Sequence, residues 1–446
     1  MNLFKFQTSN IRSSRYIKNT FLIVLFQGVN IISNFLLVTI TLDFLGVEEY
    51  GVWITLTSLM TWFSFLDIGL AHGLRNKYAE AKTENDFEKV KGLVSTAFFT
   101  LVFLSLIGFF IFFLVGFFLN WSQILNGPAN LASEFKVVGL FMIFAFFIKL
   151  ILNIVAILKT ADQQPSIATF LITSGNFLAL ASIYLLIKFY SPSFQQLGIV
   201  MTSSQIIPTV LAFGFIFSTS YRGILPKWRY FSIDHIKSIF GIGFKFFLIQ
   251  VSNLVILQSN ILIIAHICGQ KIVADYSIAY KYLWLVIVVF TSVITPLWSA
   301  STEAYIRNDI PWLKKAMKGL NKIWLLLCLV GILLVVFSPF AYKIWLRGKI
   351  EVDFLLLIFL LLNFILTMRY SMFRMFMNGV GKIQLQYRIT LIQAALHVPF
   401  AIIGAKYFGV YGVISVMILW TAINSIIEPI QFKKIISGNL SRIWTA

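Results

Sequence analysis

The sequence predicts an all-α polytopic membrane protein with about 12 transmembrane helices. Hydrophobic residues make up 59% of the 446 residues and charged residues only 12%, whereas an average soluble protein is about a quarter charged. The apolar runs are continuous and about 20 residues or longer, as a membrane-spanning helix requires, whereas barrel strands alternate over about ten residues. Since backbone amides in the bilayer core must be bonded internally, these runs favour helices.

The predicted spans follow the apolar runs in chain order. The first run, from Phe21 onward, is too long for the apolar part of a signal peptide and lacks a small-residue cleavage site, so we interpret it as a span. Short separations predict tight connections within pairs 5/6 and 11/12. The spans are placed at 20–42, 50–71, 93–118, 136–158, 167–189, 197–218, 239–266, 274–299, 320–342, 353–377, 385–406 and 409–432.

The distribution of Lys and Arg predicts the orientation. With the N-terminus in the cytoplasm, 23 of the 36 fall in cytoplasmic segments, seven in outside loops and six within spans. This excess follows the positive-inside rule and predicts that both termini are cytoplasmic. It also accounts for the net charge of +19, so we expect no nucleic-acid partner. The expected organisation is a basic N-terminal segment (1–19), an N-lobe (20–218), a cytoplasmic inter-lobe linker (219–238), a C-lobe (239–432) and a cytoplasmic tail (433–446).

Matching residues recur in the two halves at a spacing of 223 positions. Duplication explains their common order, although chance matches in a biased composition are the alternative. Six spans per half would give parallel lobes related by a pseudo-two-fold axis along the membrane normal, typical of carriers that rock two bundles around a midplane site. The repeated residues are Gln27, Asn30, Gly46, Glu80, Ala81, Asn85 and Asp86, which match Gln250, Asn253, Gly269, Glu303, Ala304, Asn308 and Asp309.

Two stripes of amide side chains are candidates for substrate binding. The first span carries Asn30 and Asn34 beside Gln27, and their spacing places all three on one helix face. The seventh span repeats the stripe with Gln250 and Asn253, followed by Asn260. Hydrogen bonds between packed helices are the alternative explanation, but recurrence in both halves favours the lining of a cavity.

Cations within the spans are the second set of candidates. Lys149 and Arg369 lie deepest, where a charge costs at least ~2.5–3.5 kcal/mol, so we expect them to line a water-filled cavity. Lys281 and Arg374 are weaker candidates, because long side chains near the membrane surface can snorkel to water. The same explanation applies to Lys245 and Arg388. A cavity with surplus positive charge suits an anionic ligand, and Arg suits phosphate oxygens.

Three titratable residues are candidates for coupling transport to an ion gradient: Asp67, His397 and Glu428. Two of them have a simpler alternative explanation. Asp67 can pair with Arg75 at a helix end, and a lone intramembrane histidine is often a packing residue. Cys268 and Cys328 form neither a disulfide framework nor a metal-binding pattern. We therefore expect no cofactor, only coupling to H+ or Na+.

One stretch identifies a family. Leu45–Trp53 reads LGVEEYGVW, Phe65–Leu70 reads FLDIGL and Gly73–Lys77 reads GLRNK. These motifs resemble the bacterial Wzx-type O-antigen flippases, within the polysaccharide-transport branch of the multidrug/oligosaccharidyl-lipid/polysaccharide exporter superfamily. The motif similarity covers about 35 residues, and the C-terminal half shows no motif of equal strength. Length, span number and repeat extend the likeness to the whole chain.

The resemblance implies a bacterial inner-membrane carrier that moves undecaprenyl-diphosphate-linked O-units, or related polysaccharide units, from the cytoplasmic to the periplasmic leaflet. It implies alternating access driven by an ion gradient. The partners it implies are the lipid-linked oligosaccharide, membrane lipids and, as a further candidate, the glycan polymerase with its chain-length machinery.

Two other functions compete with transport of a glycan carrier. A membrane glycosyltransferase or O-antigen polymerase needs a catalytic acid or base over a groove, and the outside loops are too short to build one. A multidrug exporter of the same superfamily is the other alternative. The surplus of cations within the spans argues against cationic drugs as its cargo.

Overall fold

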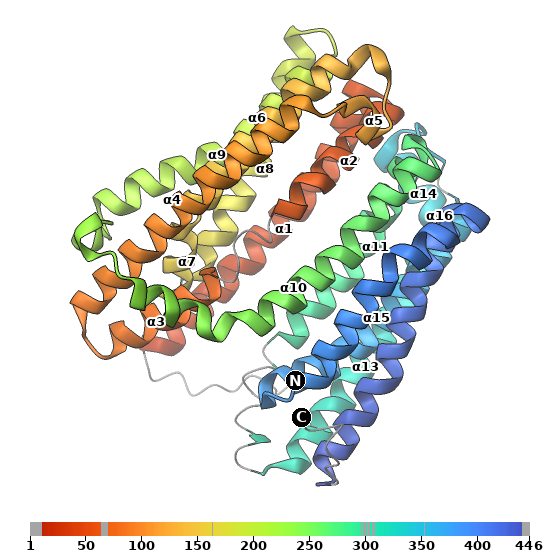
Figure 1. Cartoon of the computed structure of the whole chain (residues 1–446). Helices are drawn as coiled ribbons and strands as arrows, with labels where there is room; N and C mark the ends of the chain where they lie inside the picture. Colours follow the sequence, from red (N-terminus) through yellow and green to blue (C-terminus); the bar gives the residue numbers. More distant parts are fainter. Residues whose placement is uncertain are drawn as a thin grey trace. The chain divides into compact units, whose positions relative to one another are not determined.

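The computed structural model describes residues 11–63, 70–162, 164–295, 297, 301, 304–305, 308–351 and 353–438. All regular elements in these ranges are helices (Figure 1). Ten of them are long and apolar enough to cross a membrane, which confirms the predicted fold class. Contacts divide the chain into two units: unit 1 comprises Met1–Glu49 and Phe63–Phe247, and unit 2 comprises Tyr50–Trp62 and Leu248–Ala446.

The helices of the N-terminal half pass from α1 to α9 and end in two short 3-10 turns. Those of the C-terminal half run from α10 to α16. The bounds are α1 (Ile11–Leu45), α2 (Val47–Trp62), α3 (Leu70–Thr83), α4 (Phe87–Phe118), α5 (Trp121–Leu125), η2 (Ala129–Leu131), α6 (Ala132–Leu152), α7 (Ile154–Ala161), α8 (Pro165–Phe189), α9 (Phe194–Ser218), η3 (Arg222–Ile224), η4 (Trp228–Tyr230), α10 (Ile233–Ile267), α11 (Gln270–Ile294), α13 (Ile310–Val336), α14 (Ser338–Leu346), α15 (Phe354–Val380) and α16 (Gln384–Ile436).

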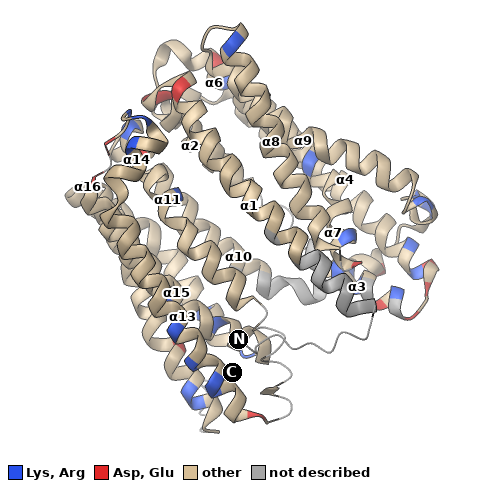
Figure 2. Ribbon diagram, turned by 180° about the vertical axis from the view of Figure 1, so that it is seen from behind, with Lys and Arg blue, Asp and Glu red and all other residues tan. Residues whose placement is uncertain are grey.

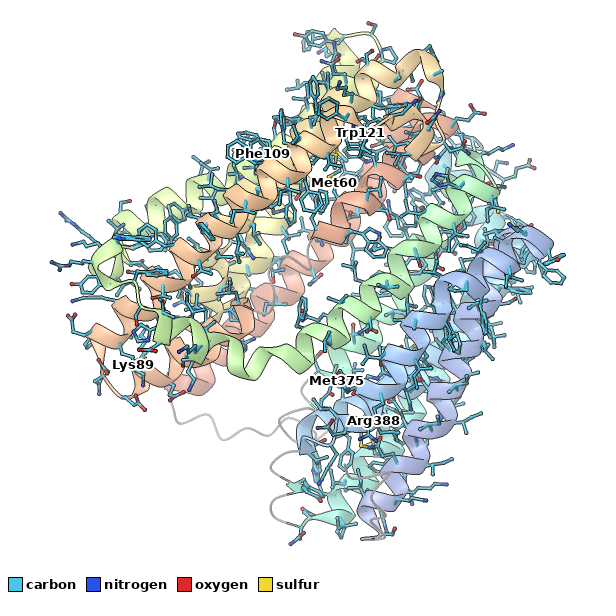
Figure 3. The ribbon with its side chains drawn as sticks, in the orientation of Figure 1. Met60, Lys89, Phe109, Trp121, Met375 and Arg388 are labelled. Carbon is cyan, nitrogen blue, oxygen red and sulfur yellow. The ribbon has the colours of Figure 1, made fainter. Side chains whose placement is uncertain are left out.

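Unit 1 is a bundle in which α1 packs on α8, α8 on α9, and α6 on both α4 and α9. Phe109 of α4 contacts rings of α6, including Phe144 at 5.9 Å between centroids (Figure 3). Trp121 of α5 donates its indole hydrogen to the carbonyl of Gly116 at 2.7 Å, which provides a partner for a carbonyl in the last turn of α4. The apolar faces of these helices that pack on no other helix are exposed, as is typical of helix faces that contact lipid.

Unit 2 is a second bundle, in which α15 packs on α11, α13 and α16. Most of α2 belongs to it. Thr55 donates to the side-chain oxygen of Gln270 at 2.9 Å, and Ser58 donates to that of Gln258 at 3.0 Å. Gly51 makes this packing possible, because a Cβ there would overlap the backbone carbonyl of Gln270.

The predicted spans 385–406 and 409–432 form one element, α16, with a reversal between them. A straight helix of 53 residues would be about 80 Å long, far more than the ~30 Å hydrocarbon core. Gly409 has φ 58° and ψ −141°, which is non-helical. Gly404 and Gly412 flank it with their backbones in contact. The two spans are therefore antiparallel arms joined without a loop.

One predicted span ends earlier than expected. The span placed at 320–342 stops at Val336, and α14 begins at Ser338. Pro339 explains the difference, because proline has no amide hydrogen and favours the first turn of a new helix. At the other end, α13 starts at Ile310, where the carboxylate of Asp309 accepts a hydrogen bond from the amide of Trp312 at 3.0 Å.

The internal repeat has a structural counterpart. Gly46 and Gly269 both have positive φ, at 84° and 93°, and Asn85 and Asn308 do so at 59° and 55°. In each half the following aspartate caps a helix, since Asp86 accepts from an amide three residues ahead, as Asp309 does. The same turns at the same 223-residue spacing support duplication over chance.

Candidate functional site

The candidate residues fall in both units and are described within each. Figure 2 shows that many Lys and Arg residues lie towards the ends of helices, with a few along them. Asp67 lies outside the described residues, and so does the side chain of Lys245. Within the described ranges, no group of three or more His, Cys, Asp and Glu side chains is arranged to hold a metal ion.

An amide network joins three helices of unit 1. Asn176 of α8 donates to the Oδ1 atom of Asn30 on α1 at 2.5 Å, and Gln205 of α9 donates to Asn176 at 2.6 Å. Asn34 donates to the same Oδ1 atom of Asn30 at 3.1 Å. The sequence analysis missed Asn176 and Gln205, although both are polar residues within predicted spans. Asn30 is therefore part of helix packing, while Asn34 remains exposed.

Lys149 lies near the C-terminal end of α6 and is partly buried. Its backbone carbonyl accepts from the amide of Asn153 at 2.9 Å, where α6 gives way to α7. Among the described residues, its ammonium group has neither an ion pair nor a hydrogen bond. The charge of this side chain is thus not compensated within the described part of unit 1.

Arg369 of α15 is held by neutral groups. Its guanidinium donates to the side-chain oxygen of Asn321 on α13. It also lies 5.3 Å from the ring centroid of Trp324 and 5.1 Å from that of Phe373, which are cation–π distances. Trp324 is fixed in turn, because its indole donates to the carbonyl of Ile365 at 3.0 Å. Arg369 is therefore oriented by its neighbours without losing its positive charge.

Arg374, one turn further along α15, forms an ion pair that the sequence analysis did not anticipate. Its Nε and Nη2 atoms donate to Oε1 of Glu428 at 2.9 and 2.5 Å. The exposed fractions of the two side chains are 16% and 5%, so the pair is buried. The guanidinium also lies 4.5 Å from the ring centroid of Tyr370. A carboxylate thus compensates Arg374, unlike Arg369.

Lys281 of α11 donates to the hydroxyl of Tyr50 at 3.0 Å, within unit 2. Its ammonium lies 5.6 Å from the ring centroid of the same tyrosine. Both contacts are with a neutral side chain. Lys281 therefore resembles Arg369 in keeping an uncompensated charge among the described residues.

A second polar network in unit 2 surrounds His397, which is fully buried. The indole of Trp420 donates to Nδ1 at 3.1 Å, so Nδ1 is the acceptor and Nε2 donates to Asn260 at 2.8 Å. Gln393 and Asn424, also missed from the sequence, bond to each other at 3.0 Å across the two arms of α16. Both ring nitrogens are occupied in the neutral tautomer.

The two networks occupy corresponding helices. In unit 1 the network joins α1, α8 and α9, the first, fifth and sixth predicted spans. In unit 2 it joins α10 and both arms of α16, the seventh, eleventh and twelfth. The amide stripe of α10 contributes Asn260, which is fully buried. Asn253 is half-buried and Gln250 is exposed, whereas Asn260 is buried within the network.

Comparison with known sequences gives a match to the family model described as polysaccharide biosynthesis protein, over residues 43–349. The "Putative O-antigen transporter" of Salmonella typhi is 22% identical over 410 residues, which are 89% of this chain and 90% of the relative. The "Putative O-antigen export protein" of Yersinia pseudotuberculosis is 22% identical over 415 residues, which are 86% and 88%. The motifs between Leu45 and Lys77 lie inside the matched range.

Solved structures share the fold. An inward-facing multidrug resistance MATE family transporter of the MOP superfamily superposes with a TM-score of 0.78 at 16% identity, covering 92% of this chain and 94% of that chain. A MOP superfamily transporter from Pyrococcus furiosus, described as having a binding pocket of reverse polarity, gives 0.69 at 17%, covering 95% and 96%. At such identities the likeness establishes the fold alone.

Proposed function

Since the chain belongs to the family of polysaccharide biosynthesis proteins, we propose that it is a flippase for a lipid-linked oligosaccharide. The observation that carries the proposal is the family match, together with two O-antigen transport relatives that align over most of both chains. The cargo that fits the motif resemblance is an undecaprenyl-diphosphate-linked O-unit or related polysaccharide unit. The membrane is the bacterial inner membrane, with both termini cytoplasmic and transfer towards the periplasm.

The chemistry of such a cargo explains why a carrier is needed. A diphosphate and a glycan would have to cross about 30 Å of hydrocarbon, where unpaired polar and charged groups are very costly. A polar, cationic passage can hold the head group while the polyprenyl chain stays in lipid. Alternating access of two parallel lobes provides such a passage.

Three side chains are the favoured diphosphate ligands: Lys149, Arg369 and Lys281. Their described partners are absent or neutral, so they retain positive charge for an anion. Arg374 is a weaker choice, because Glu428 already compensates it. Asn34, Gln250 and Asn253 are candidates for hydrogen bonds to sugar hydroxyls, and Asn30 would support Asn34 from within its network.

For coupling to H+ or Na+, Asp67 and Glu428 are the favoured candidates. His397 fits a structural role better, because its two ring nitrogens are already bonded to Trp420 and Asn260. Protonating Nδ1 would set a new N–H against the indole N–H. The glycan polymerase and its chain-length machinery are proposed as partners that receive the flipped unit.

The proposal is tested in a strain that lacks its own O-unit carrier, with Arg369→Gln, Lys149→Gln and a double variant. We expect each single variant to lower surface glycan at least tenfold, the double variant to abolish it, and Arg369→Lys to recover part of it. Arg388→Gln is the matched control, because Arg388 is exposed at the start of α16. Wild-type glycan from the double variant, at normal protein levels, would refute the cation role.

Drug export is the remaining transport function, since solved relatives of this fold are multidrug transporters. The same deletion strain separates the two. Loss of glycan without a change in drug sensitivity supports the flippase, whereas sensitivity to cationic drugs with intact glycan would overturn it.

A further inference from the structure

The connection between α9 and α10, residues 219–232, places exposed aromatic and basic side chains together; we call it the basic aromatic segment. Trp228 is 67% exposed and Leu225 is 44% exposed. Arg222, Lys227 and Arg229 are also exposed. None of these cations forms an ion pair among the described residues. Exposed apolar side chains that gather with polar residues around them mark candidate sites for contact with a membrane or a protein.

This exposure belongs to an ordered backbone. The amide of Lys227 donates to the hydroxyl of Ser95 at 3.1 Å, and the amide of Ser232 donates to that of Thr96 at 3.0 Å. Ser95 and Thr96 are fully buried in α4. The ring of Phe231 stacks on Trp228, with centroids 5.0 Å apart and planes 8° apart. The segment is thus fixed along α4 with Trp228 held outward.

Trp228 extends the apolar outer face of α4. Its ring meets that of Phe99 edge-on, at 5.0 Å and 83°. Phe99, Phe103 and Phe110 follow helical spacing and share a face. Phe103 and Phe110 are 64% and 66% exposed in a helix that is long and apolar enough to cross a membrane, so we expect this face to contact lipid. Because Trp228 contacts Phe99, one turn before Phe103, we expect it to lie at the edge of the hydrocarbon layer.

The cations lie around this anchor. Arg229 donates to the hydroxyl of Tyr230 at 2.5 Å, and its guanidinium lies 4.6 Å from that ring centroid. Lys91 reaches the same ring from α4, at 5.7 Å. Tryptophan concentrates at membrane interfaces, and Lys and Arg beside a membrane attract anionic lipids.

We propose that the basic aromatic segment binds the headgroups of anionic phospholipids, with Trp228 inserted at the hydrocarbon edge and Arg222, Lys227 and Arg229 on the phosphates. A lipid surface fits better than a soluble ligand, because Trp228 continues the exposed apolar face of a helix that is long and apolar enough to cross a membrane. The segment shares no residue with the proposed cargo ligands, and its test does not depend on flippase activity.

The experiment uses the full-length protein in nanodiscs of equal phosphatidylcholine and phosphatidylglycerol. Native mass spectrometry after detergent release gives the ratio of the two lipids retained. A cation near an anionic surface strengthens binding by up to about fivefold. The Arg222→Gln/Lys227→Gln/Arg229→Gln variant should therefore bring a several-fold phosphatidylglycerol enrichment close to one. Trp228→Ala should lower total lipid retention, and Trp228→Tyr should restore it.

The matched control removes three exposed cations from α13, by Lys314→Gln, Lys315→Gln and Lys318→Gln. We expect its enrichment to stay within twofold of wild type. An equal loss in the control, or no loss in the segment variant, would overturn the proposal. Displacement of the lipid by millimolar inorganic phosphate would assign the site to free phosphate instead. A dimer that dissociates on substitution of the segment would assign it to a second copy.

Discussion

The buried pair between Arg374 and Glu428 offers a test of how unit 2 is held together. Glu428→Met would leave the guanidinium of Arg374, which also contacts the ring of Tyr370, buried without its carboxylate partner. Removing one member of a buried ion pair typically costs 3–5 kcal/mol. Both arginine donors use the same carboxylate oxygen, and Oε2 has no partner among the described residues. The lower end, about 3 kcal/mol, is therefore expected for the single substitution.

Replacing both partners should be less harmful than replacing either. An apolar pair of similar volume often substitutes for a buried ion pair without loss. We expect the Arg374→Met/Glu428→Met variant to recover at least about 2 kcal/mol relative to the sum of the single variants. The measurement is equilibrium unfolding in mixed micelles titrated with sodium dodecyl sulfate. Arg388→Met serves as the control, with a change below about 0.5 kcal/mol expected for an exposed site.

Two results would refute this reasoning: strictly additive single effects, or a loss below about 1 kcal/mol for Glu428→Met. The same variants also address coupling. If Glu428→Gln keeps its stability yet loses glycan transport, Glu428 acts in the transport cycle rather than in packing. If stability and transport fall together, the pair is structural.

Four further predictions follow from packing and from polar contacts. Gly51→Ala should lower the free energy of unfolding by about 3 kcal/mol, because the added Cβ would overlap a backbone carbonyl. The control Gly28→Ala should not lower it, because nothing lies within 4 Å of that position. Unfolding titrations measure both variants. Asp162→Asn should lower the free energy of unfolding by about 2 kcal/mol. The substitution removes the 2.5 Å ion pair with Lys82 and weakens the hydrogen bond from Tyr221. Burial and the neighbouring carboxylate raise the pKa of the Tyr221 hydroxyl, so this tyrosine ionises in the unfolded chain before it does in the folded protein. Its contribution to the free energy of unfolding should therefore be constant below pH ~10 and fall above it. A free energy of unfolding that does not change up to pH 12 would contradict this. His397→Ala should lower the free energy of unfolding by about 3 kcal/mol. A thermal midpoint of unfolding equal to that of wild type would contradict the polar network around His397.

The hydropathy pattern predicted most spans because lipid exposure is a local property. The span placed at 167–189 is α8, Pro165–Phe189, and the span at 197–218 is α9, Phe194–Ser218. Apolar length determines such boundaries directly. Deviations arise where a local signal was overlooked, as at Pro339, which starts α14.

Pairing between spans could not be predicted in the same way. Arg374 and Glu428 are 54 residues apart, on helices whose relative rotation is not encoded in hydropathy. The same holds for Asn176, which joins Asn30 from a distant helix. A polar residue within a span is expected to face away from lipid. Only the packed structure shows whether that residue bonds to a side chain of another helix. The orientation in the membrane stays a prediction from charge.

The reversal at Gly409 has a consequence for biogenesis. Because no connecting segment separates the two arms of α16, we expect them to enter the bilayer together as a helical hairpin. The close approach of Gly404 and Gly412 would then form during insertion. A side chain at position 412 would thus lower the yield of inserted protein before any cargo is met.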